Sequence, residues 1–172
     1  MIHDDNPFSV PASERDPVRR FRGRLVAPVT IVTAGAGDRR MGLTVSSLMI
    51  ADGEPGRLLF LCGRNADLGD VIAASGGFVA HVLGSGDEWL SDRFAGIRPS
   101  PGGLFAGLDV TDGAHGPVIT TVATRAECSL STVADAGWYQ LVEGAIESVI
   151  LGEPTEPLLR FRGRYRELEP GA

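Results

Sequence analysis

The sequence predicts a single, mainly β domain, a barrel or a sandwich of short strands with helices inserted between them. Apolar and polar residues alternate with a period of two over residues 122–133 and 140–151, which is typical of half-buried strands. The 23 glycines and 11 prolines separate these runs into short pieces. The order of strand-like and helix-like segments is too irregular for a doubly wound parallel sheet. A hydrophobic content of 43% with 22% charged residues fits one globular domain.

The first elements follow from local signals near the N-terminus. Residues 1–15 are polar and broken by proline, so we expect a flexible arm there, then a domain over 16–168 and a short tail over 169–172. Asp16 is a good N-cap and Pro17 suits the first helical position, which predicts a short basic helix through Arg24. Branched residues predict a strand over 25–34. A glycine-rich turn then leads into a second strand over 41–50, and we expect the two strands to pair as a hairpin.

The remaining elements alternate between strands, helices and one long loop. Leu68, Val71 and Ile72 recur at helical spacing, and Gly76 with Gly77 predicts the end of that helix. In chain order we expect a strand over 57–62, a helix over 65–75, a strand over 78–83, a helix over 87–96, a loop over 97–117, and strands over 122–133, 140–151 and 158–168. In the helix over 87–96, Trp89, Leu90, Arg93 and Phe94 are expected to share one side.

The charge of the chain limits its partners. A net charge of -6 argues against nucleic acid or an anionic membrane as the main partner, because both favour a basic face. All 16 basic residues are arginines, so chemistry that needs a lysine amine, such as a Schiff base, pyridoxal attachment or a phosphate-loop lysine, is excluded. Nothing resembles a signal peptide or a membrane span, and we expect a cytoplasmic protein.

The cysteines and histidines do not form a recognisable catalytic or metal-binding pattern. Cys62 and Cys128 lie in apolar runs and are expected to be buried free thiols, and their spacing from the three histidines predicts no metal site. His81 alternates between apolar neighbours, as a core or rim residue would, whereas His115 in a glycine-flanked loop is expected to be exposed. There is no Gly-x-Ser-x-Gly elbow and no dinucleotide fingerprint, so we assign no catalytic side chain.

The stretch "MGLTVSSLMI" over 41–50 has the composition of a strand, yet it carries three hydroxyl side chains at Thr44, Ser46 and Ser47. Hydroxyl groups and backbone amides suit the polar edge of a planar heterocycle or a phosphate, and Gly42 would let a flat ring approach the main chain. A hydroxyl-rich edge strand that faces water would have the same composition. From these residues alone both interpretations stay open.

Several motifs occur together in a recognisable order along the chain. They are "PVTIVT" at 28–33, "GLTVSS" at 42–47, "ASGGFVAHVL" at 74–83, "RFAG" at 93–96, "LFAGLDV" at 104–110, "HGPVI" at 115–119 and "FRGRYREL" at 161–168. With these motifs the chain resembles the flavin reductase-like family, the small FMN-binding split barrels that act as reductase components of two-component flavin monooxygenases. The resemblance implies a six- or seven-stranded antiparallel Greek-key barrel with peripheral helices, and a homodimer whose interface helps to build the flavin cleft.

The resemblance also implies a function and a site. The function would be that of an NAD(P)H:flavin oxidoreductase, which reduces bound FMN or FAD and supplies reduced flavin to a partner oxygenase. The alternatives are a flavin carrier without turnover and, more remotely, a related barrel with deazaflavin or haem. Residues near the flavin would be Pro28, Val29, Thr30, Thr44, Val45, Ser46, Ser47, Arg64 and Asn65. The arginine would serve the phosphate, because its guanidinium fork suits an oxyanion.

The sequence departs from the family pattern at two places. Asp67 and Leu68 stand where members usually carry a hydroxyl near the start of a helix, and a carboxylate there would repel phosphate unless it caps the helix. Gly137, Trp138 and Tyr139 stand where many members have Gly-Asp-His in the nicotinamide pocket. The aromatic pair would form the floor of that pocket, or plug it, or pack on the end of the barrel.

Overall fold

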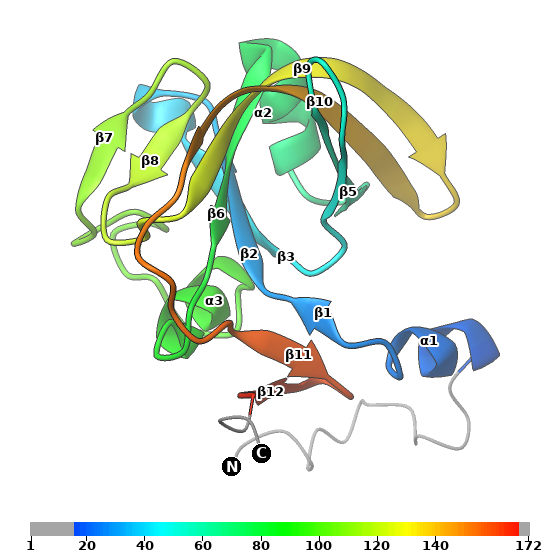
Figure 1. The fold of residues 1–172 in the computed structure, drawn as a ribbon. Helices are drawn as coiled ribbons and strands as arrows, with labels where there is room; N and C mark the ends of the chain where they lie inside the picture. Colours follow the sequence, from blue (N-terminus) through cyan, green and yellow to red (C-terminus); the bar gives the residue numbers. More distant parts are fainter. Residues whose placement is uncertain (1–15, 169–172) are drawn as a thin grey trace.

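Residues 16–168 are described in a computed structural model, which is mainly β with antiparallel sheets (Figure 1). The arm predicted over 1–15 and the tail predicted over 169–172 lie outside the described residues. The helices are α1 (Pro17–Arg22), the 3-10 helix η1 (Gly37–Arg39), α2 (Leu68–Ser75) and α3 (Glu88–Phe94). The predicted start of α1 is confirmed, because the Asp16 carboxylate accepts a hydrogen bond of 3.0 Å from the Val18 N–H. The end of α2 is also confirmed, at a left-handed Gly76.

A seven-stranded antiparallel sheet forms the centre of the molecule. Its order is β3 (Met41–Val45), β2 (Thr30–Ala34), β6 (Gly77–Val82), β9 (Arg125–Ala136), β10 (Tyr139–Ile150), β5 (Arg57–Gly63) and β4 (Met49–Ala51). The predicted hairpin is confirmed, since β2 pairs with β3 and places Thr30 opposite Val45. The single strand predicted over 41–50 is wrong. The chain leaves the ladder of β2 after Val45 and pairs with β5 from Met49 onward, so residues 46–48 join the two edge strands of the sheet.

Two small sheets lie beside the large one. The first consists of β1 (Ala27–Pro28), β11 (Leu159–Phe161) and β12 (Arg164–Arg166), and the second of β7 (Val110–Asp112) and β8 (Pro117–Ile119). Three sequence predictions are corrected here. The strand predicted over 25–34 changes sheets at Val29, whose N–H bonds the Leu158 carbonyl. The strand predicted over 158–168 is a hairpin that turns through left-handed Arg162 and Gly163. The loop predicted over 97–117 contains β7 and the start of β8.

Two cores follow from the alternation of side chains across the central sheet. Val32, Phe60 and Phe78 point to one face and form a core with α2, while Ile31 and its neighbours point to the other face and pack against Leu90 and Phe94 of α3. The side predicted for α3 is only partly correct. Leu90 and Phe94 are buried, whereas Trp89 is 44% exposed because the helix turns Ser91 inward instead.

No helix within residues 16–168 is both long enough and apolar enough to cross a membrane.

Candidate functional site

The predicted site residues come together along one end of neighbouring strands. Thr30 on β2 is opposite Val45 on β3, and the segment after Val45 reaches β5 through a bond between Ser47 and Leu61. Further along β5, Gly63 is opposite Tyr139 at the start of β10. Segments that lie up to about a hundred positions apart in sequence therefore border one region, which contains residues 28–30, 44–47, 63–65 and 137–139.

Not every hydroxyl in this region is open to a ligand. The Thr44 hydroxyl donates a 2.6 Å hydrogen bond to the Ser91 carbonyl on α3, so it ties β3 to that helix. Gly42 also allows α3 to pack closely against β3. A Cβ atom at this position would lie 2.5 Å from the Phe94 ring, which occupies the space that the sequence interpretation left for a flat ligand. The expected close approach of a ligand at Gly42 is therefore corrected, because α3 covers the main chain there.

Ser47 completes the hydrogen bonding between the broken strand and β5. Its Oγ accepts a 3.0 Å bond from the Leu61 N–H and donates a 3.3 Å bond to the Leu61 carbonyl. The side chain thus satisfies the two main-chain groups that a regular ladder would have paired. In a strict strand Ser47 would face away from Thr44 and Ser46, and the break at residues 46–48 is what directs it to β5.

The residues predicted from the first motif are mostly part of the core. Val29 and Thr30 are each 1% exposed, and the Thr30 hydroxyl donates a 2.7 Å bond to the Val45 carbonyl. Val45 is itself 3% exposed. Only Pro28 is exposed in this group. These buried residues fix the backbone of the region, and their side chains are already used within the fold.

Three exposed side chains remain as donors, namely Ser46, Arg64 and Asn65. The Ser46 hydroxyl makes no hydrogen bond within the described part of the chain. Arg64 forms an ion pair of 2.6 Å with Asp135, and both side chains are largely exposed, so an anion can compete for the guanidinium. Asp67 occupies the N-cap position of α2 but makes no capping hydrogen bond there. At the start of α2 the Gly69 N–H instead donates a 3.4 Å bond to the Ala66 carbonyl.

The turn over 137–139 lies at the tip of the β9–β10 hairpin. Gly137 adopts a left-handed conformation, with φ of 60°, and Trp138 is 82% exposed. The Tyr139 hydroxyl accepts a 3.1 Å hydrogen bond from Arg22 Nη1, which brings α1 to the edge of the site. The sequence interpretation did not include α1. The only signal that could have suggested it is the density of arginines in residues 19–24.

The buried titratable groups are poorly suited to proton transfer near neutral pH. His81 is fully buried, and burial lowers its pKa to about 4. Both ring nitrogens are engaged, Nδ1 at 3.2 Å from the Ile31 carbonyl and Nε2 as acceptor from the Ile119 N–H at 3.0 Å. Burial also raises the pKa of Cys62, and that of Cys128 to about 12. The predictions of a core histidine and of two buried free thiols are confirmed.

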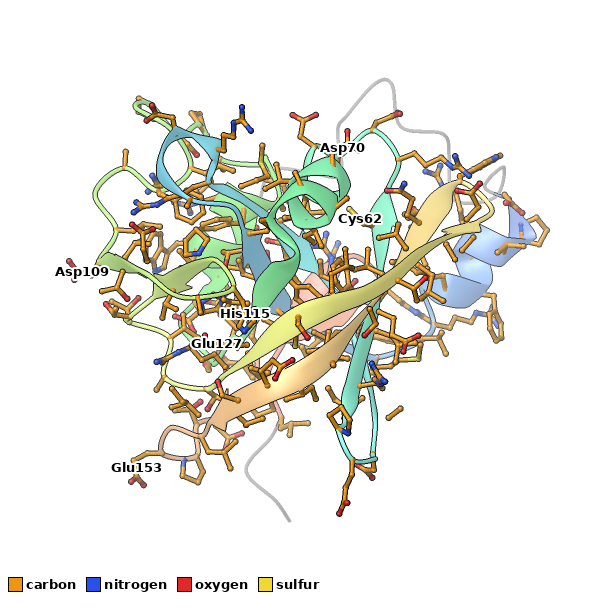
Figure 2. All side chains as sticks on the ribbon, turned by 90° about the horizontal axis from the view of Figure 1, so that it is seen from above. Cys62, Asp70, Asp109, His115, Glu127 and Glu153 are labelled. Carbon is orange, nitrogen blue, oxygen red and sulfur yellow. The ribbon has the colours of Figure 1, made fainter. Side chains whose placement is uncertain are left out.

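His115 differs from its prediction. The side chain is half-buried rather than exposed, because the ring packs on Gly77, where an added Cβ would lie 2.7 Å from Nδ1. Figure 2 shows it on the side of the molecule away from α1. His115 is therefore remote from the candidate site.

The site can thus bind and orient a ligand, but the buried His and Cys side chains do not supply an acid, a base or a nucleophile to it. Hydroxyl, amide and guanidinium groups are donors that fit the oxygen-rich edge and the phosphate of a nucleotide-like cofactor.

Comparison with known proteins decides the family, because the family model described as "Flavin reductase like domain" matches residues 22–169. The chain belongs to the flavin reductase-like family. The resemblance stated from the sequence motifs is confirmed.

Relatives of this flavin reductase-like chain include reductase components of monooxygenases. The reductase subunit of a flavin-dependent monooxygenase of Rhodococcus jostii is 31% identical over 166 residues, which covers 94% of this chain and 83% of that one. The reductase component of the 4-hydroxyphenylacetate 3-monooxygenase of Thermus thermophilus is 31% identical over 145 residues, which covers 84% of this chain and 91% of that one.

Solved structures of similar fold cover nearly the whole chain. An NADH:FAD oxidoreductase of Streptomyces globisporus, also solved in complex with NAD and FAD fragments, has a TM-score of 0.82 with 26% identity over 95% of this chain and 98% of that one. Component B of the nitrilotriacetate monooxygenase from Mycobacterium thermoresistibile has a TM-score of 0.80 with 28% identity, and covers 89% of this chain and 86% of that one.

Proposed function

We propose that this flavin reductase-like chain is an NAD(P)H:flavin oxidoreductase that supplies reduced FMN or FAD to a partner monooxygenase. The observation that carries the proposal is the convergence of Ser46, Arg64 and Asn65 with Tyr139 at one end of adjacent strands. Their hydroxyl, amide and guanidinium groups can donate hydrogen bonds to the polar ring edge and the phosphate of a flavin, the cofactor expected in this family. The relatives named as reductase components support the same activity and the same kind of partner.

The residues of the site would bind and orient the cofactor. Ser46 and Asn65 would donate to the polar edge of the ring system or to the ribityl chain. Arg64 would exchange its exposed ion pair with Asp135 for the flavin phosphate, and its charge would have to offset that of Asp67, whose carboxylate does not cap α2. A bound flavin supplies the hydride-accepting chemistry, so the protein needs no acidic or basic side chain for that step. Thr44, Ser47 and Thr30 would act indirectly, by holding the backbone that carries Ser46.

We further propose that the central sheet closes as a Greek-key split barrel. The two edge strands of the sheet, β3 and β4, are consecutive in the chain and are joined by residues 46–48. Ser47 in this joining segment bonds the main chain of β5, so the edges are linked by a side chain instead of a ladder. A gap of this kind gives a barrel that is split at the site. The split would leave room for the flavin beside Ser46.

A homodimer would complete the flavin cleft. Phe60 and Cys62 of β5 point into the core, so alternation puts Leu61 on the outer face, where it is 37% exposed. Met49 on the neighbouring edge strand is 59% exposed. These apolar side chains next to Ser46 and Ser47 are suited to a second copy of the chain, which would cover the open side of the flavin ring.

Stopped-flow mixing tests the activity. The FMN-loaded protein is mixed with NADH, and separately with NADPH, under anaerobic conditions while the flavin absorption is followed. Loss of the absorption within seconds is expected with at least one nucleotide. If neither nucleotide reduces the flavin, the reductase proposal is wrong and the protein is a flavin carrier.

The carrier is the second candidate because of Trp138. This residue and Tyr139 replace the polar residues that many members have in the nicotinamide pocket, and Trp138 is 82% exposed. If the two rings form the floor of that pocket, W138A/Y139A should raise the KM for NAD(P)H, because ring stacking contributes about 0.5 to 1.5 kcal/mol beyond area burial. Flavin affinity should change little. If the rings plug the pocket, the same variant should increase turnover.

A further inference from the structure

Half of the arginines in this acidic protein lie in two short segments. Arg19, Arg20, Arg22 and Arg24 lie in or just after α1, and Arg160, Arg162, Arg164 and Arg166 alternate along β11 and β12. Within residues 16–28 and 159–166 the only acidic residue is Asp16, although the chain carries 22 acidic residues and a net charge of -6. Positive charge is therefore concentrated in these segments while the rest of the chain is strongly negative.

The two segments adjoin at one end of the molecule, which we call the arginine face. Within it the register of β11 and β12 puts Arg160 beside Tyr165 on one side of the hairpin and Arg164 and Arg166 on the other side. β1 follows α1 and pairs with β11, so that Ala27 is opposite Arg160. The Arg162 N–H also donates a 3.1 Å bond to the Gly23 carbonyl at the end of α1. Figure 1 shows α1, β11 and β12 together at one end of the molecule. In Figure 2, Asp109 and Glu153 lie on the side away from α1.

A shallow, open hollow on the arginine face has a composition that suits a nucleotide. Pro17, Arg20, Phe21 and Arg24 line it. The Phe21 ring is 67% exposed, and the two arginines are four positions apart. Main-chain bonds from Arg20 N to the Asp16 carbonyl and from Arg24 N to the Phe21 carbonyl fix their backbone. Two like charges at this spacing repel each other, and a bound anion would relieve that repulsion. An exposed ring between two guanidinium groups suits a base with an attached phosphate.

Helix α1, which carries the hollow, borders the proposed nicotinamide region. Arg22, which directly follows Phe21, donates a 3.1 Å hydrogen bond to the Tyr139 hydroxyl. A dinucleotide with one end at residues 137–139 would therefore have α1 beside it. Pro17, Arg20 and Phe21, which line the hollow, recur at helical spacing on a different face of α1 from Arg22, so the other end of such a molecule would pass around the helix to reach the hollow.

We propose that this hollow binds an adenosine diphosphate group, with the adenine on Phe21 and the two phosphates at Arg20 and Arg24. The group is present in NADH, NADPH and FAD and is absent from FMN. The other arginines of the face attract these anionic molecules toward the site from solution. The inference rests on the proposed function for its biological role, but binding of the group itself can be measured without turnover.

Titration calorimetry with ADP is the direct test. The R20A/R24A variant should bind ADP at least about tenfold more weakly than the wild type, because two charge-assisted contacts are lost. A control variant, R39A/R98A, loses two exposed arginines outside the arginine face and should bind ADP as the wild type does. F21A keeps all charges. It should therefore weaken ADP binding, while its affinity for ADP should still decrease as the salt concentration rises. Equal ADP affinity in R20A/R24A and R39A/R98A overturns the proposal.

Further measurements identify which molecule carries the group. If FAD affinity falls in R20A/R24A while FMN affinity is kept, the group belongs to FAD. If the KM for NADH or NADPH rises more than kcat falls, and the dependence of KM on salt becomes weaker, the group belongs to the nicotinamide nucleotide. If R20A/R24A loses binding to an acidic protein but binds ADP, FAD and NADH as tightly as the wild type does, the proposal is wrong. A wild type that binds ADP through these arginines but never reduces flavin refutes the proposed function and leaves the hollow as a nucleotide site.

Discussion

Gly42 is explained by packing within the fold. The Phe94 ring of α3 lies against its Cα, and a Cβ there would approach the ring to 2.5 Å. Phe94 is 2% exposed and in edge contact with Phe105, so it has little freedom to move away. The glycine thus lets α3 cover β3, and through Thr44 and Ser91 it also sets the position of the segment that carries Ser46.

We therefore expect G42A to lower the free energy of unfolding by about 1 to 3 kcal/mol, the usual cost of overpacking a core. Urea denaturation of the flavin-free protein measures the change. G63A is the matched control, since a Cβ at Gly63 would meet no atom within 4 Å. Equal stability of G42A and the wild type would contradict the packing role.

His81 makes stability depend on pH. Burial lowers its pKa from 6.5 to about 4, because the charged ring would lose its hydration and the Ile119 N–H occupies Nε2. Between these values the unfolded chain binds a proton that the folded chain does not. The contribution of His81 is thus fully present above pH 6.5 and is lost progressively as the pH falls to about 4.

The expected loss over that interval is on the order of 3 kcal/mol. Unfolding free energies measured at several pH values test it, and H81N should show a flatter dependence between pH 6.5 and 4 even if it is less stable overall. A wild type and an H81N variant with parallel pH profiles would rule out His81 as the source.

At the scale of elements, the break between β3 and β4 creates the candidate site. A continuous strand over 41–51 would have placed Ser46 and Ser47 in a regular ladder. Because of the break, Ser47 is hydrogen-bonded to the main chain of Leu61, whereas Ser46 is exposed to solvent. The neighbouring hydroxyls therefore form a matched pair for mutation.

S47A should lower stability by about 1 kcal/mol and speed the hydrogen exchange of the Leu61 amide, because that N–H loses its partner. S46A should leave stability unchanged and weaken FMN binding by about 1 kcal/mol, the value of one hydrogen bond. Denaturation, exchange and flavin titration measure these effects. The assignment fails if S46A binds flavin as tightly as the wild type while S47A is fully stable.

At the scale of the whole molecule, the face around Met49 and Leu61 and the arginine face are both expected to be occupied in the working protein. The first is apolar and suits a second copy of the chain, whereas the second is basic and suits anions. Two copies would avoid placing arginine faces against each other, because like charges repel across an interface. The two faces thus predict different partners.

L61D should convert the proposed dimer into a monomer and reduce FMN affinity, because a charge would be buried at the interface. Light scattering coupled to size-exclusion chromatography measures the mass. I97D places the same charge at a residue of similar exposure after α3 and should remain a dimer. A wild-type monomer that binds flavin would refute the dimer.

The sequence by itself determined the family, the mainly β class and the approximate position of most elements. Alternation of apolar residues locates strands such as β9 and β10, and the local signals at Asp16 and Gly76 locate helix ends, since both depend on nearby residues. The buried state of His81 and of the two cysteines was predictable for the same reason. The family resemblance also indicated the four segments that border the candidate site.

Only the tertiary structure decided which side chains in those segments are free. Thr44, Ser46 and Ser47 are similar in sequence, but Thr44 bonds Ser91, 47 positions away, and Ser47 bonds Leu61, 14 positions away, while Ser46 stays exposed. The same holds for Gly42, whose neighbour Phe94 is on α3, and for Arg22, which reaches Tyr139 across 117 positions. Hydrogen bonds and close contacts between distant segments depend on how strands and helices pack, and no local pattern of residues encodes that packing.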